Sequence, residues 1–276
     1  MGFFGKLFEK KECNICGGEI GLLGNRKLED GNCCKACAGK LSPWFDDRRH
    51  STVDQIKAQL QYREENRAAL SSFRPTLAFG EYYTLRAELV QGVPCRFVVE
   101  QTDSYMEENA DLISFQDVTA FEIDIDEDER ELKRENSQGE SVSYVPPRYE
   151  YSYDFFAHIH VNHPYFDDIR FRLNRETLNL ETVANRSIRI NTFNRANFDP
   201  ALYPEYRQYR KECDELENLF RLGMQGAAMP GYEPAPAPVV PAAEPAPAPA
   251  AGPKFCPNCG APAEGGKFCQ YCGAKF

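Results

Sequence analysis

The sequence predicts a multidomain, mainly β protein that carries a small cysteine-rich module at each end. Eight of its eleven cysteines form Cys-x-x-Cys pairs, and these pairs lie near the two ends of the 276-residue chain. Short segments with alternating apolar and polar residues fill the middle, as expected for strands with one buried face. A stretch rich in Pro and Ala separates this middle part from the last module. We therefore divide the chain into residues 1–50, 51–75, 76–222, 223–253 and 254–276.

The composition argues against several classes of protein. The formal net charge of −10 disfavours strong binding to nucleic acid or anionic membranes, because such binding depends on Lys and Arg. No apolar run reaches the roughly 18 residues that a membrane-spanning helix needs. The N-terminal MGFFGKLFEKK has neither the apolar core nor the cleavage site of a secretory signal. We expect a cytoplasmic protein, in which cysteines bind metal rather than form disulfides.

The first module contains Cys13, Cys16, Cys34 and Cys37, with 17 residues between the two pairs. Four thiolates at this spacing are typical of structural zinc sites. Between the pairs, NRKLEDGNC predicts a hairpin with its turn at Asp30-Gly31, and a helix begins at the second pair. This order of elements is typical of a treble-clef-like zinc module. Cys33, the neighbouring cysteine, is either a packed thiol or an alternative ligand.

The segment CNICGGEIGLLGNRKLEDGNCCKACAGKLSPWF resembles the DUF4428 family, a short bacterial zinc-ribbon-type domain of unknown function. The resemblance rests on the four cysteines, the GLLGNRKL hairpin, the Asp-Gly turn and the KLSPWF exit. It implies that a zinc ion is bound by the four N-terminal cysteines, and it implies no activity.

A helix is predicted next, over Thr52–Phe73. Ser51 or Thr52 serves as its N-cap, and Pro75 ends it. Its expected inner stripe is Val53, Ile56, Leu60, Ala69, Leu70 and Phe73. Its expected exposed face is Arg63, Glu64, Glu65 and Arg67.

The middle segment predicts many strands followed by one helix, Tyr203–Leu222. The clearest strand is Tyr149–Val161, whose odd-numbered residues form one apolar face. The other predicted strands are Tyr82–Leu89, Cys95–Glu100, Ile113–Phe115, Ala120–Ile125, Ser141–Val145, Ile169–Leu173, Thr177–Glu181 and Ser187–Asn191. This order resembles bacterial PH-like domains, in which a C-terminal helix closes a strongly bent sheet. Another β-sandwich or barrel is the alternative. The resemblance implies binding of peptides, lipids or other copies of the chain.

Two groups of residues in the middle segment are weak candidates for metal binding. His158, His160 and His163 form H-x-H-x-x-H, and the first two share one face of a strand. We interpret them mainly as half-exposed histidines, with joint metal binding as the alternative. Asp124, Asp126, Asp128 and Glu135 are spaced like part of a calcium loop, but the turn glycine is missing, which favours a solvated acidic surface. We find no catalytic motif and predict no catalytic residue and no enzyme activity.

The last module follows a linker, residues 223–253, for which its Pro-Ala repeats predict an extended chain without a fold of its own. The ligands of this module are Cys256, Cys259, Cys269 and Cys272, and a glycine follows each pair. Four thiolates leave no coordination position for a catalytic water, so we predict a second structural zinc ion. Such a short segment has no apolar core and would fold by binding the metal.

These features together predict a non-enzymatic adaptor or scaffold that binds an unidentified protein partner. The first alternative is a zinc protein associated with nucleic acid or the ribosome. Residues 1–50 carry nine Lys and Arg against seven Asp and Glu, and residues 254–276 carry three against one, so both modules are mildly basic. The second alternative is a thiol redox sensor.

Overall fold

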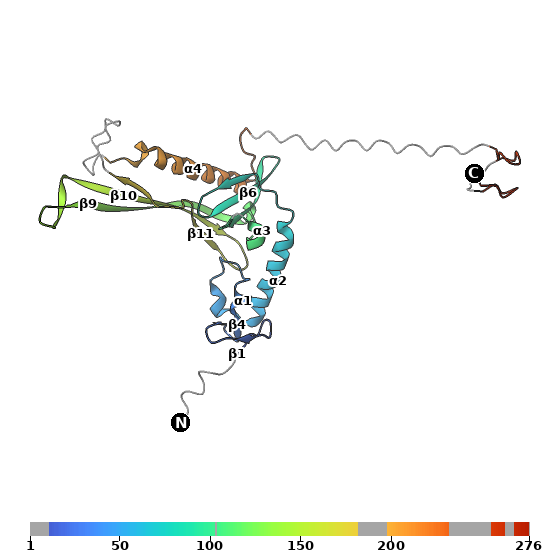
Figure 1. Ribbon diagram of the computed structural model, residues 1–276, viewed down its shortest axis with the longest axis horizontal. Coiled ribbons are helices and arrows are strands. Elements are labelled where there is room, and N and C mark those ends of the chain that lie inside the picture. Colours follow the sequence, from blue (N-terminus) through green and yellow to red (C-terminus); the bar gives the residue numbers. More distant parts are fainter. Residues whose placement is uncertain (1–10, 103, 182–197, 232–254, 263–267, 276) are drawn as a thin grey trace, which may run out of the picture. The chain divides into compact units, whose positions relative to one another are not determined.

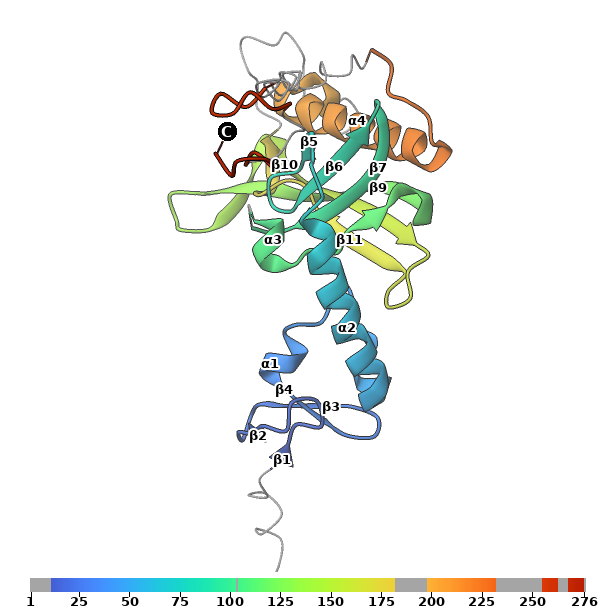
Figure 2. The same ribbon diagram turned by 90° about the vertical axis from the view of Figure 1, so that its right-hand side faces the viewer.

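A computed structural model of the chain describes residues 11–102, 104–181, 198–231, 255–262 and 268–275 (Figure 1). It divides into two compact units, Met1–Glu233 and Pro234–Phe276, and each is described here by itself. The larger unit has a mixed α/β architecture, with the N-terminal module, helix α2 and a β-rich part following one another (Figure 2). No helix in the described residues has the length and apolar character needed to cross a membrane.

The N-terminal module contains two small antiparallel hairpins. Strand β1 (Lys11–Glu12) pairs with β2 (Glu19–Ile20), and β3 (Asn25–Lys27) pairs with β4 (Asn32–Cys34). Helix α1 (Lys35–Ala38) follows β4 at once, and the 3-10 helix η2 (Asp47–His50) leads out of the module. The β3–β4 pairing confirms the predicted hairpin around Asp30-Gly31. The small core of the N-terminal module consists of Cys13, Ile20, Leu28, Cys33, Cys37, Leu41 and Ile56.

Helix α2 (Val53–Leu70) begins at a capping box. The backbone N–H of Gln55 donates to Thr52 Oγ1 at 3.3 Å, and the backbone N–H of Thr52 donates to Gln55 Oε1 at 2.8 Å. Two of the free N–H groups of the first turn are thereby satisfied. Thr52, one of the two predicted candidates, is therefore the N-cap.

The buried face of α2 differs from the predicted one. Its buried residues are Ile56, Gln59, Arg63, Asn66 and Leu70. Arg63, which we expected on the exposed face, is buried, and Ala69, expected inside, is exposed. At the ends of the helix, Ile56 lies in the core of the module and Leu70 packs with Phe73, Val98 and Ala110. Between these two contacts, the buried residues of α2 are the polar Gln59, Arg63 and Asn66.

The β-rich part contains two antiparallel sheets. Strands β5 (Leu77–Phe79), β6 (Thr84–Val90), β7 (Val93–Glu100) and β8 (Ile113–Ser114) form the first sheet in that order. In the second, β10 (Ser141–Val161) pairs with β9 (Val118–Glu135) along one edge and with β11 (Asp168–Arg172) and β12 (Leu178–Glu181) along the other. The short helices α3 (Tyr105–Glu108) and η3 (Phe115–Asp117) flank β8. The described residues form no closed barrel.

Strands β9 and β10 form one long hairpin that extends past the other strands (Figure 1). The predicted strand Ala120–Ile125 covers only part of β9, and the predicted strands Ser141–Val145 and Tyr149–Val161 are a single strand. Pro146 and Pro147 lie between the two predicted strands, where the register shifts between Ser143 and Arg148. Strand β5 and helix α3 were not predicted from the sequence. The predicted strand Ser187–Asn191 lies outside the described residues.

Helix α4 (Pro204–Gln225) follows η5 (Pro200–Leu202) and covers the core between the sheets. It runs three residues past the predicted end at Leu222. The ring of Phe220 stacks on that of Phe121, with 4.0 Å between the centroids. Gly223 lies directly against Phe115, where a larger residue has no room. The helix is therefore part of the β-rich fold. The sequence predicted its presence and its place after the strands correctly.

Candidate metal centres

The structure brings the four N-terminal cysteines together as predicted. The sulfur atoms of Cys13, Cys16, Cys34 and Cys37 all lie within 4.8 Å of one another. Cys16 Sγ and Cys34 Sγ are 3.8 Å apart. Four sulfurs bonded to zinc at about 2.3 Å in a tetrahedron are about 3.8 Å apart. The cluster therefore has the spacing that a tetrahedral ion requires.

A tight turn positions the first cysteine pair. In this turn, which we call a knuckle, the N–H of Gly17 donates to the carbonyl of Cys13 at 2.8 Å, and the N–H of Cys13 donates to the carbonyl of Gly18 at 2.9 Å. Gly17 has a φ of 72°, a left-handed conformation that favours glycine. The CxxCGG sequence therefore specifies the turn that points both thiols to one side.

Helix α1 positions the second pair. Cys34 is its N-cap, and the backbone N–H of Cys37 donates to Cys34 Sγ at 3.4 Å. The backbone N–H of Cys34 in turn donates to Cys13 Sγ at 3.2 Å. Hydrogen bonds of this kind stabilise negative sulfur, as a metal-bound thiolate requires.

The second cluster repeats this knuckle twice. The sulfurs of Cys256, Cys259, Cys269 and Cys272 lie within 4.8 Å of one another, with 3.7 Å between Cys256 and Cys272 and between Cys259 and Cys269. Gly260 and Gly273 have φ values of 71° and 74°, and their N–H groups donate to the carbonyls of Cys256 and Cys269, both at 2.8 Å. The two glycines have the role predicted for them.

The charge state of the thiols differs within each cluster. Burial raises the pKa of Cys13, but hydrogen bonds from backbone N–H groups outweigh burial and lower that pKa to about 6. Burial raises the pKa of Cys37. A hydrogen bond from the backbone of Ala274 lowers the pKa of Cys272 to about 6. The backbone of Ala261 also lowers the pKa of Cys259, but the neighbouring cysteines outweigh it and raise the value to about 12.

Each cluster thus forms its first thiolate readily, whereas further thiolates repel one another at such short separations. A bound cation removes that repulsion, and all four protein ligands then close the coordination sphere. The arrangement suits a structural metal ion, because it leaves no position for substrate or water. All eleven cysteines are free of disulfide bonds.

Cys33 lies apart from the ligands. Its side chain is fully buried in the core of the N-terminal module, and its Sγ donates to the carbonyl of Cys34 at 3.4 Å. Burial raises the pKa of its thiol to about 11. Of the two interpretations left open by the sequence, the packed thiol agrees with this position.

The structure separates the three histidines. His158 and His160 meet Asp168, an aspartate that sequence reasoning missed because it lies on another strand. His163 instead lies against α2, where its Nε2 is 2.9 Å from the hydroxyl of Tyr62. Burial lowers the pKa of His163 to about 4.

The four acidic residues that are spaced like a calcium loop do not form a loop. Asp124, Asp126, Asp128 and Glu135 all lie on the continuous strand β9. Arg170 on β11 pairs with Asp124 at 3.6 Å and with Asp126 at 3.7 Å. This arrangement agrees with the acidic surface favoured by the sequence.

A buried polar network was not predicted. Arg63 Nη1 contacts Asp111 Oδ1 at 2.5 Å, and Ser42 Oγ donates to Asp111 Oδ2 at 2.8 Å. Arg63 Nε also donates to the carbonyl of Lys40 at 3.2 Å. Because these residues come from the exit of the N-terminal module, from α2 and from the segment before β8, the network ties the module to the β-rich part.

Comparison with known proteins places the first cluster in a family. Residues 11–59 match the family described as "Domain of unknown function (DUF4428)", a range that contains all four N-terminal cysteines and the start of α2. Searches of curated proteins and of solved structures give no match. The chain therefore carries a DUF4428 domain at residues 11–59, with a four-cysteine cluster at residues 256–272 that is consistent with a second metal-binding module.

Proposed function

We propose that the protein is a non-enzymatic adaptor whose two four-cysteine modules each hold a structural zinc ion and bind protein partners. The observation that carries this proposal is the exposure of large apolar side chains on both modules. On the C-terminal module, Phe255, Phe268 and Tyr271 are 61%, 57% and 78% exposed. On the N-terminal module, Leu22 and Leu23 are 80% and 92% exposed.

Such exposure favours binding over catalysis. Aromatic residues are enriched at the energetic centres of protein interfaces, and apolar side chains exposed together on a small module mark interaction sites. In contrast, each four-cysteine cluster has no coordination position left for chemistry. We assign the aromatic residues Phe255, Phe268 and Tyr271 to partner contact and the cysteines to holding them in place.

The β-rich part supplies the platform of the adaptor in this proposal. Two antiparallel sheets covered by a C-terminal helix support the finer interpretation as a PH-like fold. The buried contact between Arg63 and Asp111 holds the N-terminal module on this platform. A linker rich in Pro and Ala separates the second module from it in sequence and raises the local concentration of that module near any partner of the platform.

Quantitative cross-linking and affinity capture with the full-length chain tests the adaptor function. We expect Phe268→Ser combined with Tyr271→Ser to remove a defined set of partners, and Leu22→Ser combined with Leu23→Ser to remove another. Val90→Ser is the matched control, because Val90 is an apolar residue that is 53% exposed and belongs to neither module. Recovery of the same proteins in equal yield by all four chains, with zinc retained, would contradict the proposal.

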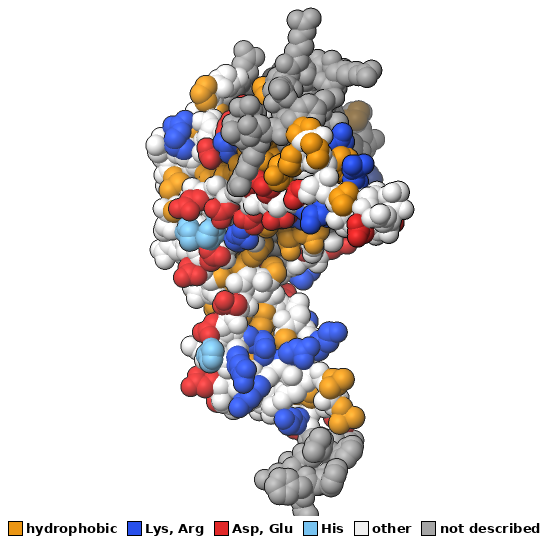
Figure 3. All heavy atoms as spheres, turned by 90° about the vertical axis from the view of Figure 1, so that its left-hand side faces the viewer, with side chains coloured by type: hydrophobic (Ala, Val, Ile, Leu, Met, Phe, Trp, Pro, Cys, Tyr) orange, Lys and Arg blue, Asp and Glu red, His pale blue; other side chains and the backbone are white. Residues whose placement is uncertain are grey.

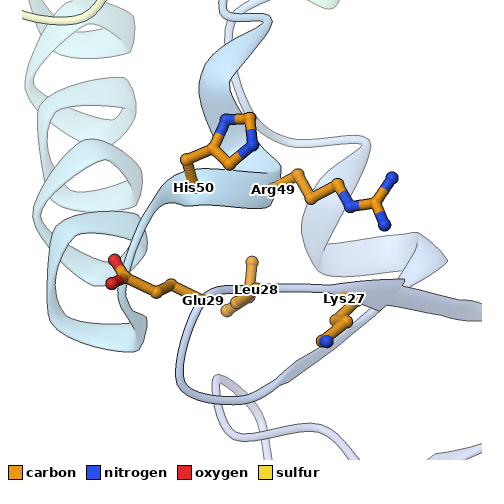
Figure 4. A pocket seen from close by; sticks show the side chains of 5 residues that line it. All are labelled: Lys27, Leu28, Glu29, Arg49 and His50. Atoms are coloured by element: carbon orange, nitrogen blue, oxygen red, sulfur yellow. The ribbon is translucent and has the colours of Figure 1, made fainter.

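A second candidate function, association with nucleic acid, is favoured by a hollow on the N-terminal module. Lys27, Leu28, Glu29, Arg49 and His50 line a cavity of about 330 Å³ (Figure 4). Lys and Arg side chains gather on this module in the space-filling view (Figure 3). Lys and Arg next to a hollow are typical of phosphate contacts.

Fluorescence anisotropy with labelled RNA and DNA, measured over a range of salt concentrations, tests this second function. A phosphate-binding face predicts affinity that falls steeply with salt, and a smaller salt dependence when Lys27 and Arg49 are changed to Ala. Changing Lys211 and Arg221 on α4 to Ala is the matched control. Absence of binding at low salt would exclude this function and leave the adaptor proposal intact.

A further inference from the structure

Two histidines and one aspartate meet on the β9–β10–β11 sheet, outside both cysteine clusters. His158 and His160 are two residues apart on β10 and therefore point to the same face. Asp168, the first residue of β11, lies directly opposite His160 in the strand register. One nitrogen of each histidine and one oxygen of Asp168 lie within 4.8 Å of one another. The three side chains thus converge although 10 residues separate His158 from Asp168.

The ligand atoms of this group, which we call the His–Asp cluster, lie close enough together to reach one metal ion. His160 Nδ1 is 3.6 Å from Asp168 Oδ1, and His158 Nε2 contacts the same oxygen. The two imidazole rings are 4.2 Å apart between centroids. Nitrogen and oxygen ligands about 2.0–2.1 Å from a tetrahedral zinc ion are about 3.4 Å apart. Small side-chain rotations therefore suffice to place the three atoms around one ion.

The fold holds the backbone of the cluster in place. The residues that alternate with the histidines, Ala157, Ile159 and Val161, are buried in the main core. Ile169, which follows Asp168, is buried there as well. Strand pairing and core packing thus fix the positions from which the three ligands project, and little ordering remains to oppose metal binding.

The charges around the cluster favour a cation. Glu122 lies opposite His158 on β9 and adds negative charge to this face. Arg170 lies opposite His158 on β11, but its guanidinium is engaged by Asp124 and Asp126 and lies 3.9 Å over the ring of Phe156. In the space-filling view of the β-rich part, histidine side chains reach the surface among acidic ones (Figure 3).

The exposure of the cluster differs from that of the two four-cysteine sites. The side chains of His158, His160 and Asp168 are 21%, 38% and 49% exposed, so solvent reaches the position between them. Two imidazoles and a carboxylate suit divalent first-row transition metals, and three protein ligands leave at least one coordination position for an outside molecule.

We propose that His158, His160 and Asp168 bind a third divalent transition-metal ion, with an open position that accepts water or a small anionic ligand. This site is independent of the adaptor function, because no residue of the His–Asp cluster belongs to either cysteine module. Its ion exchanges with solvent, in contrast to the ions of the two closed clusters.

Titration calorimetry with Zn²⁺ tests the proposal on the full-length chain whose two cysteine clusters are already saturated. We expect one further ion to bind per chain, and Asp168→Asn to weaken this binding at least about tenfold. His158→Ala combined with His160→Ala removes it. Asp167→Asn and His50→Gln are matched controls, because Asp167 and His50 are exposed and lie outside the cluster. Both controls bind the third ion as the unchanged chain does.

Two results would overturn the proposal. One is the absence of a third binding event in the saturated chain. The other is equal binding by the unchanged chain and by the double variant His158→Ala, His160→Ala. A Co²⁺ titration adds a second readout, because cobalt at the His–Asp cluster gives visible absorption without the intense near-ultraviolet band of cobalt thiolates. Two tightly bound zinc ions in every variant verify that the fold is kept.

Discussion

Arg63 and Asp111 form a buried ion pair, with side chains only 4% and 0% exposed. Charged residues are rarely buried unless they are paired, which is why the sequence pattern placed Arg63 outside. Its partner lies 48 residues away, and neither helical spacing nor composition reveals such a distant contact. The cysteines were predictable for the opposite reason, since Cys-x-x-Cys turns are local and carry their own geometry. The sequence therefore predicted correctly that the cysteines form two clusters of four, and it could not predict the buried contact between Arg63 and Asp111.

Removing one charge of this pair should destabilise the protein strongly. We expect Arg63→Ala to lower the free energy of unfolding by about 3–5 kcal/mol, because Asp111 is left buried with the hydrogen bond from Ser42 but without a cationic partner. Urea unfolding followed by circular dichroism measures the change. The double variant Arg63→Met, Asp111→Leu should recover much of the loss. An effect below about 0.5 kcal/mol for Arg63→Ala would contradict a structural role for the pair.

His163 should make the stability depend on pH. Its pKa is about 4 in the folded chain, below the ordinary value of 6.5, because the imidazole is buried and lies near Arg63. The unfolded chain therefore binds more protons between these values, so stability falls as pH decreases from about 6.5 to about 4. Allowing for partial exposure, we expect a loss of about 1–2 kcal/mol from this residue.

His163→Gln should remove this contribution. Chemical denaturation of both chains between pH 4 and 7 measures the difference, and any acid-induced loss of metal is common to both. Identical pH profiles for the two chains would show that His163 titrates as an exposed histidine does.

At the scale of elements, the strands were predictable where one face is buried and the other is not. Along Tyr149–Val161 every odd-numbered residue is apolar, and β10 indeed buries these residues from Tyr151 to Val161. The outer parts of β9 and β10 are exposed on both faces, so no apolar pattern marks them. Pairing with each other, rather than burial, makes these segments strands, with a shift in register between Ser143 and Arg148. The sequence therefore predicted the covered half of the hairpin but, of its projecting half, only the short strand Ser141–Val145.

Gly223 sets how closely α4 approaches the first sheet. A Cβ atom at this position would lie 2.5 Å from a ring carbon of Phe115. We expect Gly223→Ala to destabilise the protein by about 1–3 kcal/mol, although alanine normally favours a helix by about 1 kcal/mol over glycine. Thermal unfolding measures the effect, with the partly exposed neighbour Met224→Ala as control. A stabilised Gly223→Ala variant would mean that the helix lies farther from Phe115.

At the scale of the whole molecule, two four-cysteine clusters lie near the two ends of the sequence. Their local sequences alone specify three of the four cysteine turns, each with a left-handed glycine after the pair. The fourth pair depends on α1, which the sequence also predicted from its position after the β3–β4 hairpin. No sequence pattern predicts which aromatic and leucine side chains are exposed, because their exposure depends on the fold around them. The two four-cysteine clusters therefore followed from sequence, whereas the exposure of the apolar side chains that we propose to bind partners required the structure.

The zinc content of a variant without the His–Asp cluster tests the central claim most directly. We purify the His158→Ala, His160→Ala chain in reductant and measure zinc per chain by mass spectrometry of the metal. We expect two zinc ions per chain, and one zinc ion per chain after the cysteines of either cluster are changed to Ser. A zinc content well under two ions per chain in the His158→Ala, His160→Ala variant would contradict two structural zinc sites. Disulfide bonds among the eight cysteines in a structure of this variant would contradict them as well.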